Sequence, residues 1–171
     1  MKFQYQVAPD IYQGDSINRF LLGKTGKNML VIIGVNPSTA NNIESDKTIN
    51  DFVIPISLHN GYDGWLMVNS YPEIATKFHT LGTTLNPKLH QDNLHEIALV
   101  LKQYVSYDVW CAWGGYIKER TYLPKCLFDV KQLLMPKMKN ALSIGQLSDG
   151  LTPKHPIRQP QTSILNPFTF Y

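Results

Sequence analysis

A continuous apolar run, residues 29–35 (MLVIIGV), constrains the fold of this chain more than any other feature. Its length and its β-branched residues are typical of a strand buried on both faces, as in parallel sheets covered by helices. The run ends at Asn36-Pro37, because proline cannot continue a central strand. The sequence therefore predicts an α/β fold with a functional loop, residues 34–38, at the carboxyl end of a buried strand.

Shorter apolar runs predict three more strands of the same sheet. They alternate with helical patterns, which favours a parallel sheet with helices on both faces. We therefore expect one domain over residues 1–171, a three-layer α/β sandwich with a mainly parallel, four-stranded central sheet. Turn signals predict a hairpin or short strands before the sheet, and the aromatic tail is expected to dock. The four expected strands are residues 29–35, 65–68, 108–113 and 141–144.

Helices are expected between these strands. The first covers residues 45–58, where Ser45 or Asp46 can cap it and Pro55 should end or bend it. The second, residues 86–104, has the clearest helical periodicity of apolar residues. The long loop before this second helix is a candidate functional segment, because long loops in compact domains often carry function.

A basic, helix-like segment covers residues 116–139 and is broken by Pro124 and Pro136. Its charges have two interpretations, a patch that faces phosphate or a plain solvated face. The formal net charge of +3 permits a weak attraction to phosphate but does not identify a nucleic-acid surface. The cations of the segment are Lys118, Arg120, Lys125, Lys131, Lys137 and Lys139.

The composition argues against several protein classes. Hydrophobic residues make up 43% of the chain and charged residues 17%, which is ordinary for a globular protein. The two cysteines, Cys111 and Cys126, form no C-x-x-C motif, and the histidines lack metal-ligand spacing, so we expect neither a metal nor a cofactor. No signal peptide and no membrane-spanning stretch is recognised, which favours a cytoplasmic location and no membrane partner.

Polar or glycine-bearing segments follow each expected strand. Ligands of open α/β sheets bind beyond the carboxyl ends of the strands, so these segments should converge on one rim. This convergence is the main structural inference from the sequence. The segments are Asn36-Pro37-Ser38, Asn69-Ser70, Trp113-Gly114-Gly115 and Lys154-His155-Pro156.

Three side chains on this rim suggest chemistry, and each also has a structural interpretation. The Asn36 amide can hold a water or a ligand carbonyl but is not a strong base, and it can equally form an Asx-turn. Asn69 can pair with a uracil-like base edge, or only form a turn at the strand end. His155 can stabilise a developing anion, or lie exposed in its loop. Ser38 can instead cap a helical turn.

These motifs together resemble the domain-of-unknown-function family numbered 1643. The run Asn-Pro-Ser-Thr-Ala is the most specific of them, and the others gain weight from their order. The chain departs from the family pattern at Lys47, at residues 71–74, where an arginine is usual, and at Arg158. The matching residues are 34–40, Asp46-Lys47-Thr48, Asn69, Ala75-Thr76, Asn93, Ala112-Trp113-Gly114, Gly150 and His155-Pro156.

A more distant resemblance is to the uracil-DNA glycosylase superfamily. It implies that Asn36 positions the attacking water, that Asn69 reads the base and that His155 stabilises the leaving base anion. The strong water-activating aspartate of the most active branch is absent, because Asn36 is an amide. Residues 157–158 are a loose substitute for the segment that wedges the duplex open.

The leading hypothesis is a protein of glycosylase-like fold that recognises a nucleobase, nucleotide or nucleic acid, and that hydrolyses an N-glycosidic bond if it is an enzyme. The alternative is a non-catalytic binding module that uses the same pocket, and a weaker option is an interaction protein whose tail, residues 168–171, is a docking strand. Aromatic rings at the rim could stack on a base. Asn36 and His155 are the catalytic candidates, and the substrate-binding candidates are Pro37, Ser38, Asn69, Tyr71, Trp113 and Gly114, with Phe78 as a further stacking candidate.

Overall fold

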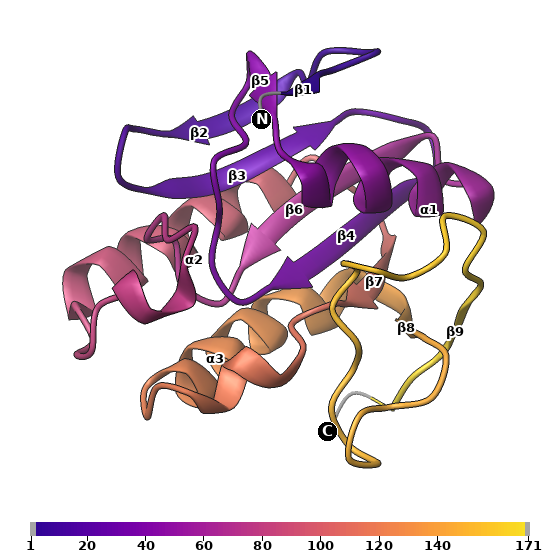
Figure 1. Cartoon of the computed structure of the whole chain (residues 1–171). Helices are drawn as coiled ribbons and strands as arrows, with labels where there is room; N and C mark the ends of the chain where they lie inside the picture. Colours follow the sequence, from indigo (N-terminus) through magenta and orange to yellow (C-terminus); the bar gives the residue numbers. More distant parts are fainter. Residues whose placement is uncertain (1–2, 170–171) are drawn as a thin grey trace.

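The apolar run forms strand β4 (Met29–Gly34), and all six of its residues are buried. In the computed structural model, which describes residues 3–169, β4 lies at the centre of the sheet (Figure 1). It pairs in parallel with β6 (Gly64–Asn69) on one side and β7 (Tyr107–Cys111) on the other, and β8 (Met138–Ile144) runs parallel to β7.

The prediction of a four-stranded sheet was wrong, because the sheet has seven strands in the order β2-β3-β6-β4-β7-β8-β9. The hairpin of β2 (Ile11–Gly14) and β3 (Arg19–Lys24) extends one edge through antiparallel pairing of β3 with β6. At the other edge, β9 (Leu165–Pro167) pairs antiparallel with β8. The sequence predicted the hairpin, but not that it joins the main sheet.

Helices cover both faces of the sheet. On one face, here called the α1 face, Leu30 and Ile32 of β4 share a hydrophobic core with Ile56 of α1 (Ile54–His59). On the opposite α2/α3 face, Val31 and Ile33 pack in a core with α2 (Pro87–Leu101) and α3 (Leu123–Leu134). Figure 1 shows α1 in front of the sheet and the other two helices behind it. The mixed α/β layering therefore agrees with the prediction.

The first helix differs from its predicted form. Ser45 belongs to a short strand, β5 (Glu44–Ser45), which pairs with β1 (Phe3–Gln4). Asp46 accepts a hydrogen bond from the Ile49 amide at 2.9 Å, as expected of a cap, and a π-helical turn η1 (Ile49–Val53) leads into α1. Pro55 does not end the helix. The Asp51 carbonyl, which Pro55 cannot bond, accepts instead from the Gln161 side chain at 2.9 Å.

The remaining helices fit the pattern with shifted boundaries. Asn86 caps α2, as its side chain accepts from the Leu89 amide, and the helix ends three residues before Tyr104. Prolines lie in the first turn of both α3 and the 3-10 helix η4 (Met135–Lys137), where their missing N–H costs no helical bond. Two more 3-10 turns are η2 (Phe78–Thr80) and η3 (Gly115–Lys118). No helix within residues 3–169 has the length and apolar character needed to cross a membrane.

The aromatic tail docks on its own chain, as predicted. The Phe168 amide donates to the Ala141 carbonyl at 2.8 Å, and the Phe168 ring meets Trp113 edge to face at 6.1 Å between centroids. Leu165–Pro167 therefore completes the sheet of this molecule. Residues 170–171, which the docking-strand hypothesis also included, lie outside the described residues.

Candidate functional site

The chain reverses direction across the sheet at β4, and this reversal creates the candidate site. From β4 the chain passes through α1 to β6 on one side, and from β6 it passes through α2 to β7 on the other. The loops that leave β4 and β7 therefore diverge to opposite faces. Such a switch point leaves a crevice beyond the carboxyl ends of the strands, where ligands of open α/β sheets bind.

Asn69, the last residue of β6, points to the α1 face at this edge. It is paired with Gly34 of β4, and a Cβ added at Gly34 would lie 2.8 Å from the Asn69 Oδ1 and 2.6 Å from the Met67 Cε. Glycine at position 34 thus leaves room for the Asn69 amide. The side chain is 0% exposed, and neither Oδ1 nor Nδ2 has a hydrogen-bond partner within residues 3–169. Leaving a buried polar group unpaired costs about 1–3 kcal/mol.

His155 lies against the end of β7, although it comes more than forty residues later. The Gly114 amide donates to the Pro153 carbonyl at 3.1 Å, and a Cβ added at Gly114 would lie 3.0 Å from the His155 Cβ. Gly114 has a φ of +64°, a conformation that favours glycine. The structure therefore brings together two of the predicted segments, 113–115 and 154–156.

The hydrogen bonding of His155 defines its tautomer. Its Nδ1 accepts from the Ile157 amide at 3.1 Å, which assigns the ring proton to Nε2 when the imidazole is neutral. Burial lowers the pKa of His155 and so favours the neutral ring, while the negative charge of Asp46 acts in the opposite direction. A neutral imidazole with its Nε2–H free of other bonds within residues 3–169 can donate to an anion or a carbonyl.

Asn36 has a structural task at the rim. Its Nδ2 donates to the carbonyls of Pro37 and Ala75, both at 3.0 Å, and so ties the β4 loop to the loop that follows β6. Both amide hydrogens are engaged, so Oδ1 is the atom left to accept a hydrogen bond from a ligand or a water. Pro37 is buried, and Ser38 is half-buried.

Tyr71 and Trp113 pack into the α2/α3 face. Tyr71 is 1% exposed, meets Tyr122 edge to face at 5.1 Å and accepts at its hydroxyl from the Asn86 amide. Trp113 is 6% exposed beneath Phe168. Neither ring offers an open face for a base. Phe78 stacks on Tyr116, which is 60% exposed.

Sequence reasoning missed Arg19 as a site residue, and it assigned Asp46 only a cap. Arg19 is 2% exposed, its Nη1 donates to the Ala40 carbonyl at 2.8 Å, and its Nε has no partner. The Asp46 Oδ2 accepts from the Ala40 amide at 3.3 Å, so both side chains hold one short segment. Burial lowers the pKa of Arg19, and the charge of Asp46 opposes this effect. An arginine in an edge hairpin gives no sequence signal that it is buried.

The family comparison matches this region of the chain. The family described as "Protein of unknown function (DUF1643)" matches residues 19–157, most of the chain. The chain belongs to the DUF1643 family. The matched region begins at Arg19 and ends two residues after His155, so it contains every side chain of the candidate site. No curated protein and no solved structure matches the chain, so the comparisons give no support to a resemblance to uracil-DNA glycosylases.

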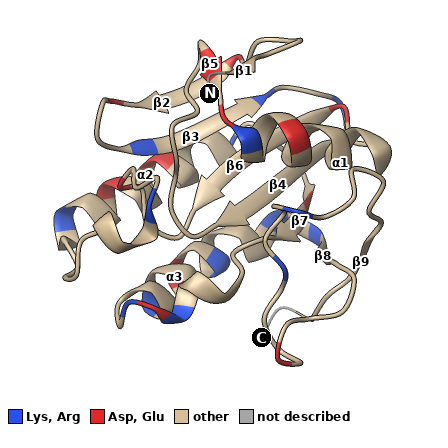
Figure 2. Cartoon of the chain, in the orientation of Figure 1, with Lys and Arg blue, Asp and Glu red and all other residues tan. Residues whose placement is uncertain are grey.

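Most cations of the basic segment in this DUF1643 protein have internal partners. Lys118 pairs with Asp149 at 2.6 Å and Lys125 with Asp129 at 2.8 Å. Arg120 and Lys137 donate to backbone carbonyls. Figure 2 shows Lys and Arg interspersed with Asp and Glu along α2 and α3. The segment therefore contributes more to tertiary structure than to a concentrated phosphate-binding patch.

Cysteine and metal chemistry find no support at the rim of the DUF1643 protein. Cys111 and Cys126 are both buried free thiols, and burial raises the pKa of Cys111 and raises that of Cys126 to about 12. A thiol with a raised pKa is a poor nucleophile at neutral pH. Among the described residues, no three His, Cys, Asp or Glu side chains come close enough to hold a metal ion.

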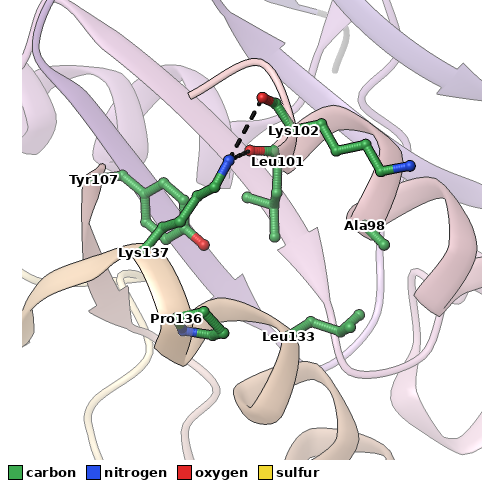
Figure 3. Close-up of a pocket in the computed structure, with 7 residues that line it drawn as sticks. All are labelled: Ala98, Leu101, Lys102, Tyr107, Leu133, Pro136 and Lys137. Atoms are coloured by element: carbon green, nitrogen blue, oxygen red, sulfur yellow. Dashed lines mark hydrogen bonds between the residues drawn. The ribbon is translucent and has the colours of Figure 1, made fainter. Parts of the chain in front are cut away.

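Two hollows of the DUF1643 protein lie away from Asn69 and His155. A groove of about 660 Å³ opens beside Tyr71, between the β2–β3 turn and the start of α2. A hollow of about 150 Å³ lies at the amino ends of the strands, lined by Tyr107 and Lys137 among others (Figure 3). Neither hollow is lined by Asn69, whose side chain is fully enclosed.

Proposed function

We propose that this protein recognises a nucleobase-bearing ligand at the α1 face of the sheet, where β4, β6 and β7 end. The fully buried, unpartnered amide of Asn69 carries this proposal. A carbonyl oxygen and a ring N–H of a uracil-like edge would satisfy its Nδ2 and Oδ1 together. The ligand would then repay the cost of the unpaired amide, which is about 1–3 kcal/mol.

His155 supports a catalytic form of the proposal. In N-glycosidic hydrolysis, a water oxygen bonds to the anomeric carbon while the carbon–nitrogen bond breaks, and the bonding electron pair leaves with the base. A neutral Nε2–H donor at His155 would stabilise the base anion as it forms. The proton lost by the water finally resides on the released base. This role matches what the resemblance to uracil-DNA glycosylases implies for the histidine.

Asn36 favours the alternative, a binding module without turnover. Both of its amide hydrogens bond to backbone carbonyls, so only Oδ1 remains to orient a water. An amide oxygen can accept a hydrogen bond from water but cannot readily deprotonate it. Binding of a nucleotide without release of its base would support this alternative.

The test combines a binding assay with a base-release assay. Calorimetry with uracil, uridine monophosphate and short oligonucleotides measures binding, and release of free base from uracil-containing single- and double-stranded DNA measures turnover. We expect Asn69→Leu to abolish binding and His155→Gln to slow any turnover. The matched controls are Asn166→Leu and His59→Gln, at two exposed positions outside the four polar segments of the rim. If the Asn69→Leu, His155→Gln double variant behaves as the wild type does, the site is assigned wrongly.

A further inference from the structure

Arg19, the first residue of β3, lies beside the end of β6. The two strands are neighbours in the sheet (Figure 1), and Leu22 of β3 pairs with Met67 of β6. Three residues before Leu22, the Arg19 amide donates to the Pro72 carbonyl at 2.9 Å. The chain between Met67 and Pro72 contains Asn69. Arg19 therefore lies alongside the segment of Asn69 at the carboxyl edge, where neighbouring strands are about 4.8 Å apart.

The side chains of Arg19 and Asn69 share the α1 face and are both left with unpaired polar atoms. The Arg19 Nη1 donates to the carbonyl of Ala40, which belongs to the core on that face. Arg19 is 2% exposed, and its Nε has no hydrogen-bond partner within residues 3–169. The Oδ1 and Nδ2 of Asn69 lack partners in the same part of the chain. Two neighbouring strands thus bring two unpaired donors, Nε and Nδ2, and one unpaired acceptor, Oδ1, to one face.

The charge around Arg19 favours a neutral acceptor over a phosphate. Asp46 interacts electrostatically with Arg19, and its carboxylate accepts from the amide of Ala40, the residue whose carbonyl Arg19 bonds. The negative charge of Asp46 offsets that of the guanidinium, so a phosphate would be repelled by one side chain while it is attracted by the other. A carbonyl oxygen needs only an N–H donor, which the Nε of Arg19 supplies.

We propose that Arg19 binds a second carbonyl of the ligand, so that Arg19 and Asn69 together select a base with a carbonyl, a ring N–H and a second carbonyl in a row, as in uracil. The proposal rests on the proposed function and narrows its ligand to diketo bases. The ring N–H would donate to Oδ1 of Asn69, one carbonyl would accept from Nδ2, and the other would accept from Nε of Arg19. Cytosine is rejected, because its amino group and bare ring nitrogen reverse two of these three hydrogen bonds.

The test compares uracil with 4-pyrimidinone, which keeps a ring N–H and one carbonyl but lacks the second carbonyl. In calorimetry, the wild type should bind uracil about 10- to 150-fold more tightly, the range for one hydrogen bond to a charged group. Arg19→Lys keeps the positive charge beside Asp46 but replaces the Nε–H by a methylene, so it should bind both bases equally. The matched control is Arg120→Lys, because the Arg120 Nε already donates to the Gly82 carbonyl at 3.3 Å.

The outcomes separate this proposal from the proposed function. If the wild type binds both bases equally and Asn69→Leu abolishes both, the role of Arg19 is overturned and the proposed function stands. If the preference for uracil persists in Arg19→Lys, another group binds the second carbonyl and the proposal is overturned. If Arg19→Lys weakens binding of uridine monophosphate but not of uracil, Arg19 holds phosphate and the proposal is again overturned. If the wild type binds neither base, the proposed function fails and this proposal with it. The comparison of the two bases on the wild type tests the proposal even if Arg19→Lys does not fold.

Discussion

Two polar side chains at opposite ends of the parallel strands, Lys137 and Asn69, differ in their hydrogen bonding. At the amino edge, the Lys137 Nζ donates to the Leu101 carbonyl at 2.9 Å (Figure 3). It also donates to the Tyr104 carbonyl at 2.7 Å, and the Tyr107 hydroxyl donates to the Leu134 carbonyl. At the carboxyl edge, the Oδ1 and Nδ2 of Asn69 are buried without a hydrogen-bond partner in the described part of the chain.

Under the proposed function, this difference distinguishes a polar residue that stabilises the fold from one that binds a ligand. A buried group with its hydrogen bonds made contributes to stability, whereas one left unpaired costs about 1–3 kcal/mol. Lys137 and Asn69 should therefore respond in opposite directions to apolar substitution. Substitution of Lys137 should lower the free energy of unfolding and leave ligand binding unchanged. Substitution of Asn69 should abolish ligand binding and raise the free energy of unfolding.

The largest expected effect is at the amino edge. Lys137→Met keeps the aliphatic stem but removes the ammonium that bonds the last carbonyls of α2, so the free energy of unfolding should fall by about 2 kcal/mol. Urea unfolding followed by circular dichroism measures it. Nucleotide binding to the folded fraction should match the wild type. Equal stability of variant and wild type would show that the two edges do not differ in the way argued.

The second effect has the opposite sign. Asn69→Leu replaces an unpaired buried amide with an apolar group of nearly the same shape, so the free energy of unfolding should rise by about 1–2 kcal/mol. The same urea titration measures the change, and calorimetry with a nucleotide should show that binding is lost. The backbone carbonyl of residue 69, which accepts from Asn93 at 3.0 Å, is unaffected by the substitution. A fall in stability would mean that the amide serves the fold.

The four parallel strands were predictable from the sequence because they depend on local signals. β4 was recognisable from an unbroken apolar run that ends at proline, and Asn69 and His155 from polar segments after strands. What the sequence did not predict is that further strands join this sheet. β3 and β9 join it through antiparallel pairing with distant strands, and a short strand carries no local sign of its partner.

The roles of the polar residues were also beyond the sequence. Asn36 and Asn69 both lie at the carboxyl ends of apolar strands. The Asn36 Nδ2 donates to the carbonyls of Pro37 and Ala75, whereas the Asn69 amide has no hydrogen-bond partner among the described residues. That difference comes from which loop packs against each strand end. Arg19 shows the same limit, because its burial depends on the contact of the hairpin with the segment around Ala40.

The smallest expected effect sharpens the comparison at the carboxyl edge through pH. Burial lowers the pKa of His155 below its ordinary value of 6.5, against the opposing charge of Asp46. Between the folded-state pKa and about pH 6.5, the unfolded chain therefore binds more protons than the folded protein does. The stability contribution of neutral His155 is fully present above pH 6.5, and it is lost as the pH falls through this window. Urea unfolding from pH 8 to pH 5 should show wild type losing more stability than His155→Gln, whose amide can still accept from Ile157. If the two stability curves run parallel over that range, the ring is not held neutral by burial, and the argument that His155 offers a neutral Nε2–H donor at the rim fails with it.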